Sequence, residues 1–152
     1  MKDHALKEHL FDFCNEFVRN RIERIMAQMK EIQEALESET KSSAGDKHET
    51  GRAMLQLERE KLGNQLAEAE NMGRLLQKVT IAPIKRKAAL GSLVKTSKAN
   101  YFLAISAGEY GLSKDKNYCI SLHTPIAKLL LGKTVGETFS FNGTEIRILA
   151  IS

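Results

Sequence analysis

Residues 18–36 read VRNRIERIMAQMKEIQEAL, and their apolar side chains recur at alternating steps of four and three residues. This spacing is typical of a coiled-coil seam, where one apolar stripe of a helix packs against a second helix. The stretch therefore predicts a long helix that needs a partner to bury its stripe. A further apolar set extends the stripe upstream, slightly out of phase: Leu6, Leu10, Phe13 and Phe17.

A partner helix follows after a short polar segment. Residues 40–45 contain almost nothing apolar, and small polar residues compete with helical hydrogen bonds and favour a turn. With about 30 residues in each helix, the two would form an antiparallel hairpin about 45 Å long, at 1.5 Å rise per residue. The second stripe consists of Leu55, Leu62, Leu66, Ala69, Gly73 and Leu76.

The composition of the chain changes near residue 80. Before it there is no proline and the residues are mostly good helix formers; after it come Pro83, Pro125, more glycine and more β-branched residues. We therefore predict an α+β protein in three parts. These are a helical hairpin over 1–80, a basic linker over 81–90 and a small α+β domain over 91–152.

Short elements are predicted within the C-terminal part. The segments 93–94, 101–105 and 118–120 have the composition of strands. A short helix is expected over 126–131, because a capping threonine and a proline precede it and a glycine follows it. Asn142-Gly143 supplies the left-handed positions of a tight turn and predicts a β-hairpin over 138–151.

The overall composition bounds the class of protein. The 152 residues are 42% hydrophobic and 28% charged, which is typical of a globular chain. The formal charge of +4 is weak support for nucleic-acid binding. Cys14 and Cys119 have no CxxC spacing, and no leader or membrane-spanning apolar run is present. We expect a cytoplasmic protein that does not contact membranes.

Basic residues dominate the segment around the predicted linker. Residues 71–108 contain no Asp or Glu. One interpretation is a solvated basic connector; the other is a patch that faces nucleic acid or an acidic partner. The basic residues of the segment are Arg74, Lys78, Lys85, Arg86, Lys87, Lys95 and Lys98.

An acidic pair marks the predicted end of the hairpin, in Gly45-Asp46-Lys47-His48-Glu49. Asp46 and Glu49 are three residues apart, so a helix brings both carboxylates to one side. Exposed there, they are expected to be charged at neutral pH and could share a Mg²⁺ that another molecule also coordinates. The other interpretation is a capping box at the start of the second helix. Both can hold if Asp46 turns outwards when a partner binds.

These features resemble the Gre transcript-cleavage factors of bacteria, which carry a coiled-coil hairpin and an FKBP-like C-terminal domain. The family's tip motif is Gly-Asp-x-x-Glu, and Gly45, Asp46 and Glu49 match its three defining positions. The family's C-terminal signature is a Ser-Pro, a short apolar helix, then Gly-Lys and Gly-Asp. Residues 123–137, HTPIAKLLLGKTVGE, are similar to it. The resemblance covers both halves of the chain.

The resemblance implies a function. The C-terminal domain would dock on RNA polymerase, with His123, Thr124, Pro125 and Ile126 in the docking segment, and the hairpin would enter the secondary channel. Asp46 and Glu49 would help to hold the polymerase's second Mg²⁺ and orient a water, so that the polymerase cuts the 3′ end of a backtracked transcript. The chain itself would then not be an enzyme, would bind no cofactor alone and would act as a monomer.

The sequence departs from the family pattern in ways that leave alternatives open. Lys47 and His48 add positive charge beside the acids, Thr50 stands where the family has Asn, and His123 where it has Asn or Asp. The first alternative is a regulator that occupies the secondary channel without stimulating cleavage, or that inhibits it. The second is a helical-hairpin interaction module unrelated to polymerase, which uses the basic linker for RNA or an acidic partner.

Overall fold

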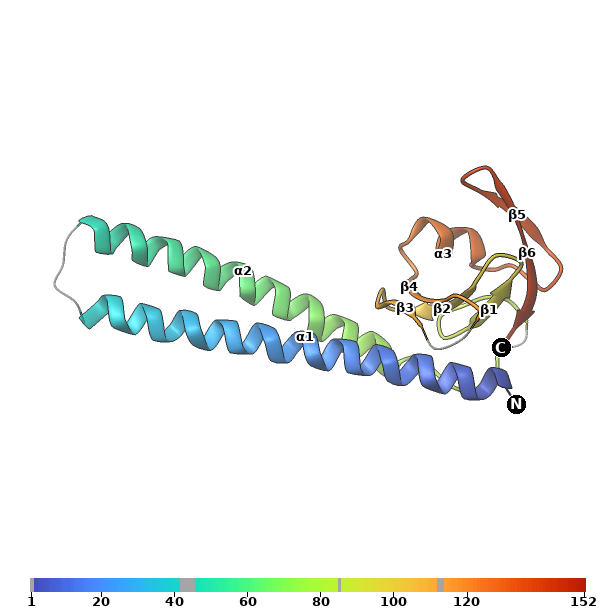
Figure 1. Ribbon diagram of the computed structural model, residues 1–152, viewed down its shortest axis with the longest axis horizontal. Coiled ribbons are helices and arrows are strands. Elements are labelled where there is room, and N and C mark those ends of the chain that lie inside the picture. The colour runs from blue at the N-terminus through green and yellow to red at the C-terminus, as the bar shows by residue number, and fades with distance from the viewer. Residues whose placement is uncertain (1, 42–45, 85, 112–113) are drawn as a thin grey trace. The chain divides into compact units, whose positions relative to one another are not determined.

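The computed structural model describes residues 2–41, 46–84, 86–111 and 114–152, without the side chains of 40, 41 and 46–48 (Figure 1). The chain forms two compact units. The hairpin unit is Val18–Gly73, and the sheet unit combines Met1–Phe17 with Arg74–Ser152. The ranges 1–80, 81–90 and 91–152 stay a prediction, because a compact grouping does not test which segments fold independently.

The hairpin unit consists of parts of two long helices, α1 (Lys2–Lys41) and α2 (Asp46–Gln77). A Cβ atom added at Gly73 would lie 3.6 Å from Val18 Cγ1, and one at Gly51 would lie 3.8 Å from Glu39 Oε1. The start of one helix therefore lies beside the end of the other, which confirms the antiparallel hairpin. Its buried core contains Ile25, Leu62 and Ala69, with Ile22, Met29, Ile32 and Leu66 packed against it.

The N-terminal part of α1 packs within the sheet unit. Leu10 and Cys14 have no exposed surface, and the rings of Phe13 and Tyr110 meet edge-on with centroids 5.4 Å apart. The apolar stripe of α1 thus serves two partners: α2 from Val18 onward, and the sheet unit before it. This change of partner explains why the upstream residues are out of phase with the seam.

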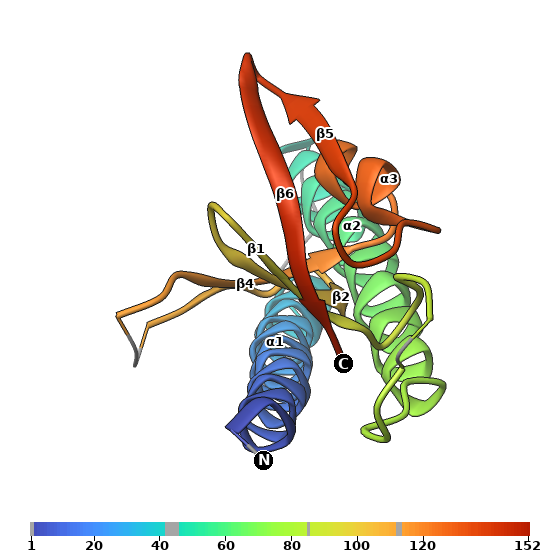
Figure 2. The same ribbon diagram turned by 90° about the vertical axis from the view of Figure 1, so that its right-hand side faces the viewer.

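One sheet of six strands is formed by the described residues, in the order β3-β4-β2-β1-β6-β5. Figure 2 shows β5 and β6 lying side by side. Strands β2 and β4 run parallel, and every other neighbouring pair is antiparallel. The bounds are β1 Leu93–Thr96, β2 Asn100–Ala104, β3 Gly108–Tyr110, β4 Asn117–Ser121, β5 Thr138–Phe141 and β6 Thr144–Ile151.

A short helix, α3 (Pro125–Leu130), contributes to the core of the sheet unit. Its buried residues Ile126, Ala127 and Leu130 share one hydrophobic cluster with residues of the strands. Burial of these side chains is the main favourable term that holds helix and sheet together. The strand members of the cluster include Val94, Tyr101, Leu103, Phe139, Ile146, Ile148 and Ile151.

The structure confirms the α+β class and most of the predicted short elements. The three strand segments, α3 and the β-hairpin all form where the sequence places them. Asn142 and Gly143 have φ angles of 50° and 78°, as the tight turn requires. Strand β3 was not predicted. No helix among the described residues is long and apolar enough to cross a membrane.

Candidate functional site

The first candidate region is the start of α2, which begins at Asp46. Glu49 follows one turn later and its side chain is exposed. Gly45 lies outside the described residues, as do the side chains of Asp46, Lys47 and His48. Both acidic residues therefore belong to the first turn of α2, where the partial positive charge of a helix N-terminus favours carboxylates by about 0.3–1 kcal/mol. The capping and metal-binding interpretations of the pair both stay open.

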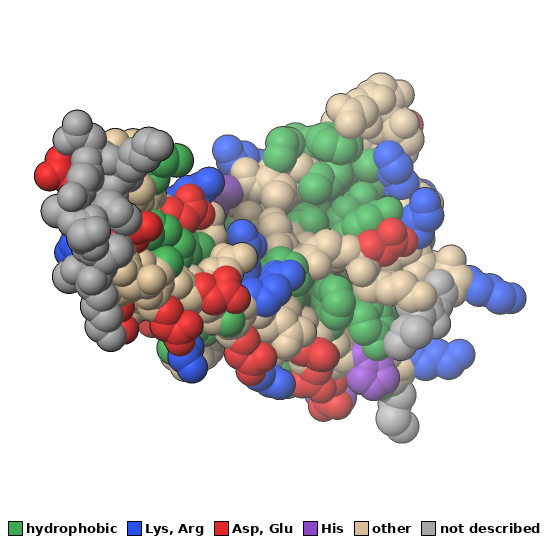
Figure 3. All heavy atoms as spheres, turned by 60° about the vertical axis from the view of Figure 1, so that its left-hand side comes forward, with side chains coloured by type: hydrophobic (Ala, Val, Ile, Leu, Met, Phe, Trp, Pro, Cys, Tyr) green, Lys and Arg blue, Asp and Glu red, His purple; other side chains and the backbone are tan. Residues whose placement is uncertain are grey.

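A further carboxylate lies close to this region on the other helix. The Glu39 carboxyl group approaches Gly51, two residues beyond Glu49, with Oε1 3.8 Å from where a Cβ at Gly51 would be. Figure 3 shows acidic side chains on the visible face of the hairpin unit. Sequence reasoning missed Glu39 because its proximity depends on the register of α1 against α2. The spacing of the two apolar stripes was the signal that could have set this register.

The oxygen donors at the start of α2 determine whether this region could bind a Mg²⁺ ion. Among the residues that the structure describes, no group of three or more His, Cys, Asp or Glu side chains could hold a metal. Mg²⁺ is commonly bound by one or two carboxylates together with phosphates and water from elsewhere. The exposed Glu49 carboxylate has the donor chemistry for such a shared ion, and the ion would take its remaining ligands from outside this chain.

The second candidate region is the turn before α3, which is organised by Thr124. Its hydroxyl accepts a hydrogen bond from the Ala127 N–H (3.3 Å) and donates to the Ser121 carbonyl (2.9 Å). Thr124 is therefore the N-cap of α3, with Pro125 at the first helical position. The His123 N–H donates to Ser121 Oγ at 3.3 Å, which further fixes the turn. The threonine and proline shape this segment through local backbone chemistry.

The predicted docking residues differ in how far their side chains are exposed to solvent. His123 and Pro125 are exposed, and Thr124 is half-buried with its hydroxyl used by the cap. Ile126 is 8% exposed and belongs to the core of the sheet unit. A partner would therefore meet His123 and Pro125 directly, while Ile126 holds the helix in place. Lys128, which is also exposed on α3, was not singled out from the sequence.

The basic segment around the linker acquires acidic neighbours in the fold. Lys95 forms an ion pair with Asp3 at the start of α1. Glu137 accepts hydrogen bonds from the Thr134 N–H (2.5 Å) and hydroxyl (3.1 Å), which lower its pKa, and Lys133 and Lys87 lower it further. Part of the positive charge in residues 71–108 is thus matched by acids from other segments. The net positive charge around this segment in the fold is therefore smaller than its sequence alone suggests.

Comparisons with known proteins give distant structural similarity. No protein-family profile matches the chain, and no curated protein matches it. Among solved structures, that of the transcription factor Gfh1 is 23% identical with a TM-score of 0.33, and the match covers 86% of this chain and 92% of that one. The class defined by the structure itself is a two-unit α+β protein in which a helical hairpin accompanies a six-stranded sheet. At this TM-score the match adds no argument about function.

Proposed function

We propose that the chain is a transcription elongation factor that binds RNA polymerase through its secondary channel and stimulates cleavage of backtracked transcripts by the polymerase. The observation that carries the proposal is the position of the Gly45-Asp46-x-x-Glu49 motif. Its described part opens α2, which begins at Asp46, and in sequence the motif lies between the two helices of the antiparallel hairpin. The Glu49 carboxylate is exposed in the first turn of this helix, so it could reach another molecule's active site.

The proposed mechanism assigns a separate role to each region. The segment around His123 and Pro125 would contact the polymerase, because both side chains are exposed and the Thr124 cap fixes the turn that carries them. Glu49 and Asp46 would contribute oxygen ligands to a Mg²⁺ shared with the polymerase. Bound there, the ion would activate water and stabilise negative charge on the phosphate. The chain itself would position ligands and leave bond cleavage to the polymerase.

A second candidate is a channel-binding regulator that does not stimulate cleavage. The departures from the Gre tip pattern favour it: two potentially positive side chains, Lys47 and His48, lie between the acids, and Thr50 follows them. Glu39 beside Gly51 adds a carboxylate to the same end of the hairpin. In this candidate, Asp46 and Glu49 would act mainly on the stability of the first turn of α2.

The two candidates are distinguished by transcript cleavage on a purified backtracked elongation complex. The test protein is the Asp46→Asn, Glu49→Gln double variant. The matched control is Glu58→Gln with Glu60→Gln, which removes two exposed charges further along α2. Cleavage stimulation should need Asp46 and Glu49 and survive in the control, while polymerase binding persists in both variants.

Other outcomes would reject parts of the proposal. No stimulation by the wild-type protein, with polymerase binding intact, would reject the cleavage role and leave the regulator. Equal stimulation by wild type and the Asp46, Glu49 variant would remove those residues from the mechanism. Failure of the wild-type protein to bind core polymerase would reject both candidates and favour an interaction module with another partner.

A further inference from the structure

Cys14 lies on the buried face of α1, in the part of the helix that belongs to the sheet unit. It has no exposed surface, and neither has Leu10, which lies one turn earlier on the same face. The residue before it, Phe13, contacts Tyr110 of β3, with the ring centroids 5.4 Å apart. This segment of α1 therefore packs against the end of the sheet that β3 and β4 form.

Cys119 is the middle residue of β4 and is 1% exposed. Its neighbours Tyr118 and Ile120 pack against the hydrophobic cluster that contains the residues of α3. Successive side chains of a strand point to opposite faces of the sheet, so Cys119 points away from that cluster. On this other face its side chain forms a hydrogen bond with the side chain of Cys14.

The fold thus brings together two thiols that are far apart in the sequence. They are the two cysteines of the chain, and both are free. Sulfur atoms in hydrogen-bond contact already have much of the proximity that a disulfide requires. The hydrogen bond with Cys14 and burial both raise the pKa of the Cys119 thiol, so the closed pair contains little of the reactive thiolate.

We propose that Cys14 and Cys119 form an intramolecular disulfide when the protein meets a hydroperoxide, and that this bond fastens α1 to β4. One sulfur, as its thiolate, attacks a peroxide oxygen, breaks the O–O bond and becomes a sulfenic acid. The other thiol then attacks the sulfenic sulfur, forms the S–S bond and releases the oxygen as water. The thiols lose two electrons and two protons, and hydrogen peroxide is reduced to two molecules of water.

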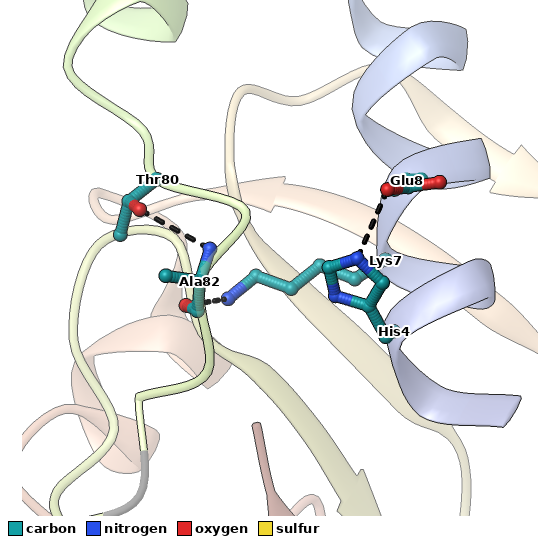
Figure 4. Close-up of polar contacts among 5 residues, drawn as sticks. All are labelled: His4, Lys7, Glu8, Thr80 and Ala82. Carbon is teal, nitrogen blue, oxygen red and sulfur yellow. Dashed lines mark hydrogen bonds and ion pairs between the residues drawn. The ribbon is translucent and has the colours of Figure 1, made fainter. Parts of the chain in front are cut away.

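Access to the thiols depends on the start of α1. Figure 4 shows Lys7 reaching from α1 to Ala82, whose main-chain oxygen accepts a hydrogen bond from Nζ at 3.1 Å. This bond and the burial of Leu10 hold the helix closed over Cys14. Oxidation therefore requires a local opening of the first turns of α1, so the pair responds slowly and to sustained oxidant.

Once formed, the disulfide would oppose that same opening. It closes a loop of roughly 100 residues, and loops of this length give a large loss of entropy in the unfolded chain. The sheet unit is built from two separate pieces of chain, and Cys14 and Cys119 lie one in each piece. Oxidation would thus replace a non-covalent contact between the two pieces with a covalent bond.

The test treats the folded full chain with hydrogen peroxide for several hours, then unfolds it in urea with iodoacetamide. Untreated protein should take up two labels, one for each cysteine. Treated protein should remain monomeric, take up no label and regain both labels after dithiothreitol. A protease digest of the treated protein should contain peptides joined through Cys14 and Cys119. Methionine oxidation does not interfere, because it consumes no thiol and dithiothreitol does not reverse it.

The fastening role has its own readout. Urea unfolding followed by tyrosine fluorescence should give a midpoint roughly 1–2 M higher for the oxidised chain than for the reduced one. The matched control is Cys119→Ser with Ile120→Cys, which keeps two cysteines and nearly the same loop but puts the second thiol on the opposite face of β4. This variant, with its fold checked by circular dichroism, should form no intramolecular disulfide.

The wild-type measurements alone can overturn the proposal. Thiols that still take up both labels after overnight treatment would do so, as would a loss of labels that dithiothreitol does not restore. Disulfides that join two molecules would also reject it. An oxidised chain that unfolds at the same urea concentration as the reduced one would reject the fastening role, and a disulfide in the folded control variant would show that the fold does not select the pair.

Discussion

Loss of the Thr124 hydroxyl should destabilise the sheet unit measurably. Thr124→Ala removes the N-cap hydrogen bond to Ala127, which is worth about 1 kcal/mol. It also removes the bond to the Ser121 carbonyl, worth about 0.5–1.5 kcal/mol. The free energy of unfolding should therefore fall by about 2 kcal/mol. Thr124→Ser keeps the hydroxyl and should cost much less.

Urea unfolding followed by tyrosine fluorescence can measure this loss of stability in the sheet unit. All three tyrosines of the chain, Tyr101, Tyr110 and Tyr118, belong to the sheet unit, so the signal reports on that unit alone. With a urea dependence of about 1–3 kcal/mol per molar, Thr124→Ala should lower the midpoint by roughly 1 M. A Thr124→Ala midpoint equal to that of wild type, or equal losses in the Ala and Ser variants, would refute the capping argument.

Three further predictions concern other positions. Gly63→Ala should stabilise the hairpin by about 0.5–1 kcal/mol, because an added Cβ meets nothing within 4 Å and alanine favours helix. Thermal unfolding followed by circular dichroism measures this change, and a destabilised variant would contradict the prediction. Asn117→Ala should lower the free energy of unfolding by about 1–3 kcal/mol, measured by urea unfolding. The buried side-chain amide of Asn100 donates to Asn117 Oδ1 at 2.9 Å, and the substitution leaves it without this acceptor. Retention of full stability would show that another group satisfies Asn100. The folded state lowers the pKa of Glu137 below its ordinary 4.5, so its contribution to stability is present above that pH and is lost as pH falls through the folded pKa. The difference in stability between wild type and Glu137→Gln, measured by urea unfolding from pH 7 to 3, should therefore shrink towards acid, and a constant difference would contradict this.

Local sequence signals predicted the elements whose structure depends on a few neighbouring residues. Thr124-Pro125 places the start of α3 because the cap and the fixed proline φ act within one turn. Asn142-Gly143 places the β-hairpin because few other residue pairs accept its backbone angles. In the hairpin unit, the seam from Val18 to Leu36 was predicted because one partner helix imposes one period.

Features that depend on distant contacts were not predictable in the same way. Strand β3 has three residues and a mainly exposed edge, so it lacks the apolar alternation that marks a strand. Lys7 is a charged residue in a helix, and only the fold reveals that it is buried. At the candidate site, the motif predicted Asp46 and Glu49, while the approach of Glu39 to Gly51 required the pairing of two helices.

The sheet unit is assembled from two pieces of chain that the hairpin unit separates. During synthesis, residues 1–17 emerge well before the strands against which Leu10 and Cys14 are buried. The sheet unit therefore depends on contacts of long sequence separation, whose loop closure slows folding. If the hairpin folds first, it shortens the effective loop and brings residue 17 near residue 74. The hairpin would then act as an intramolecular folding aid for the sheet unit.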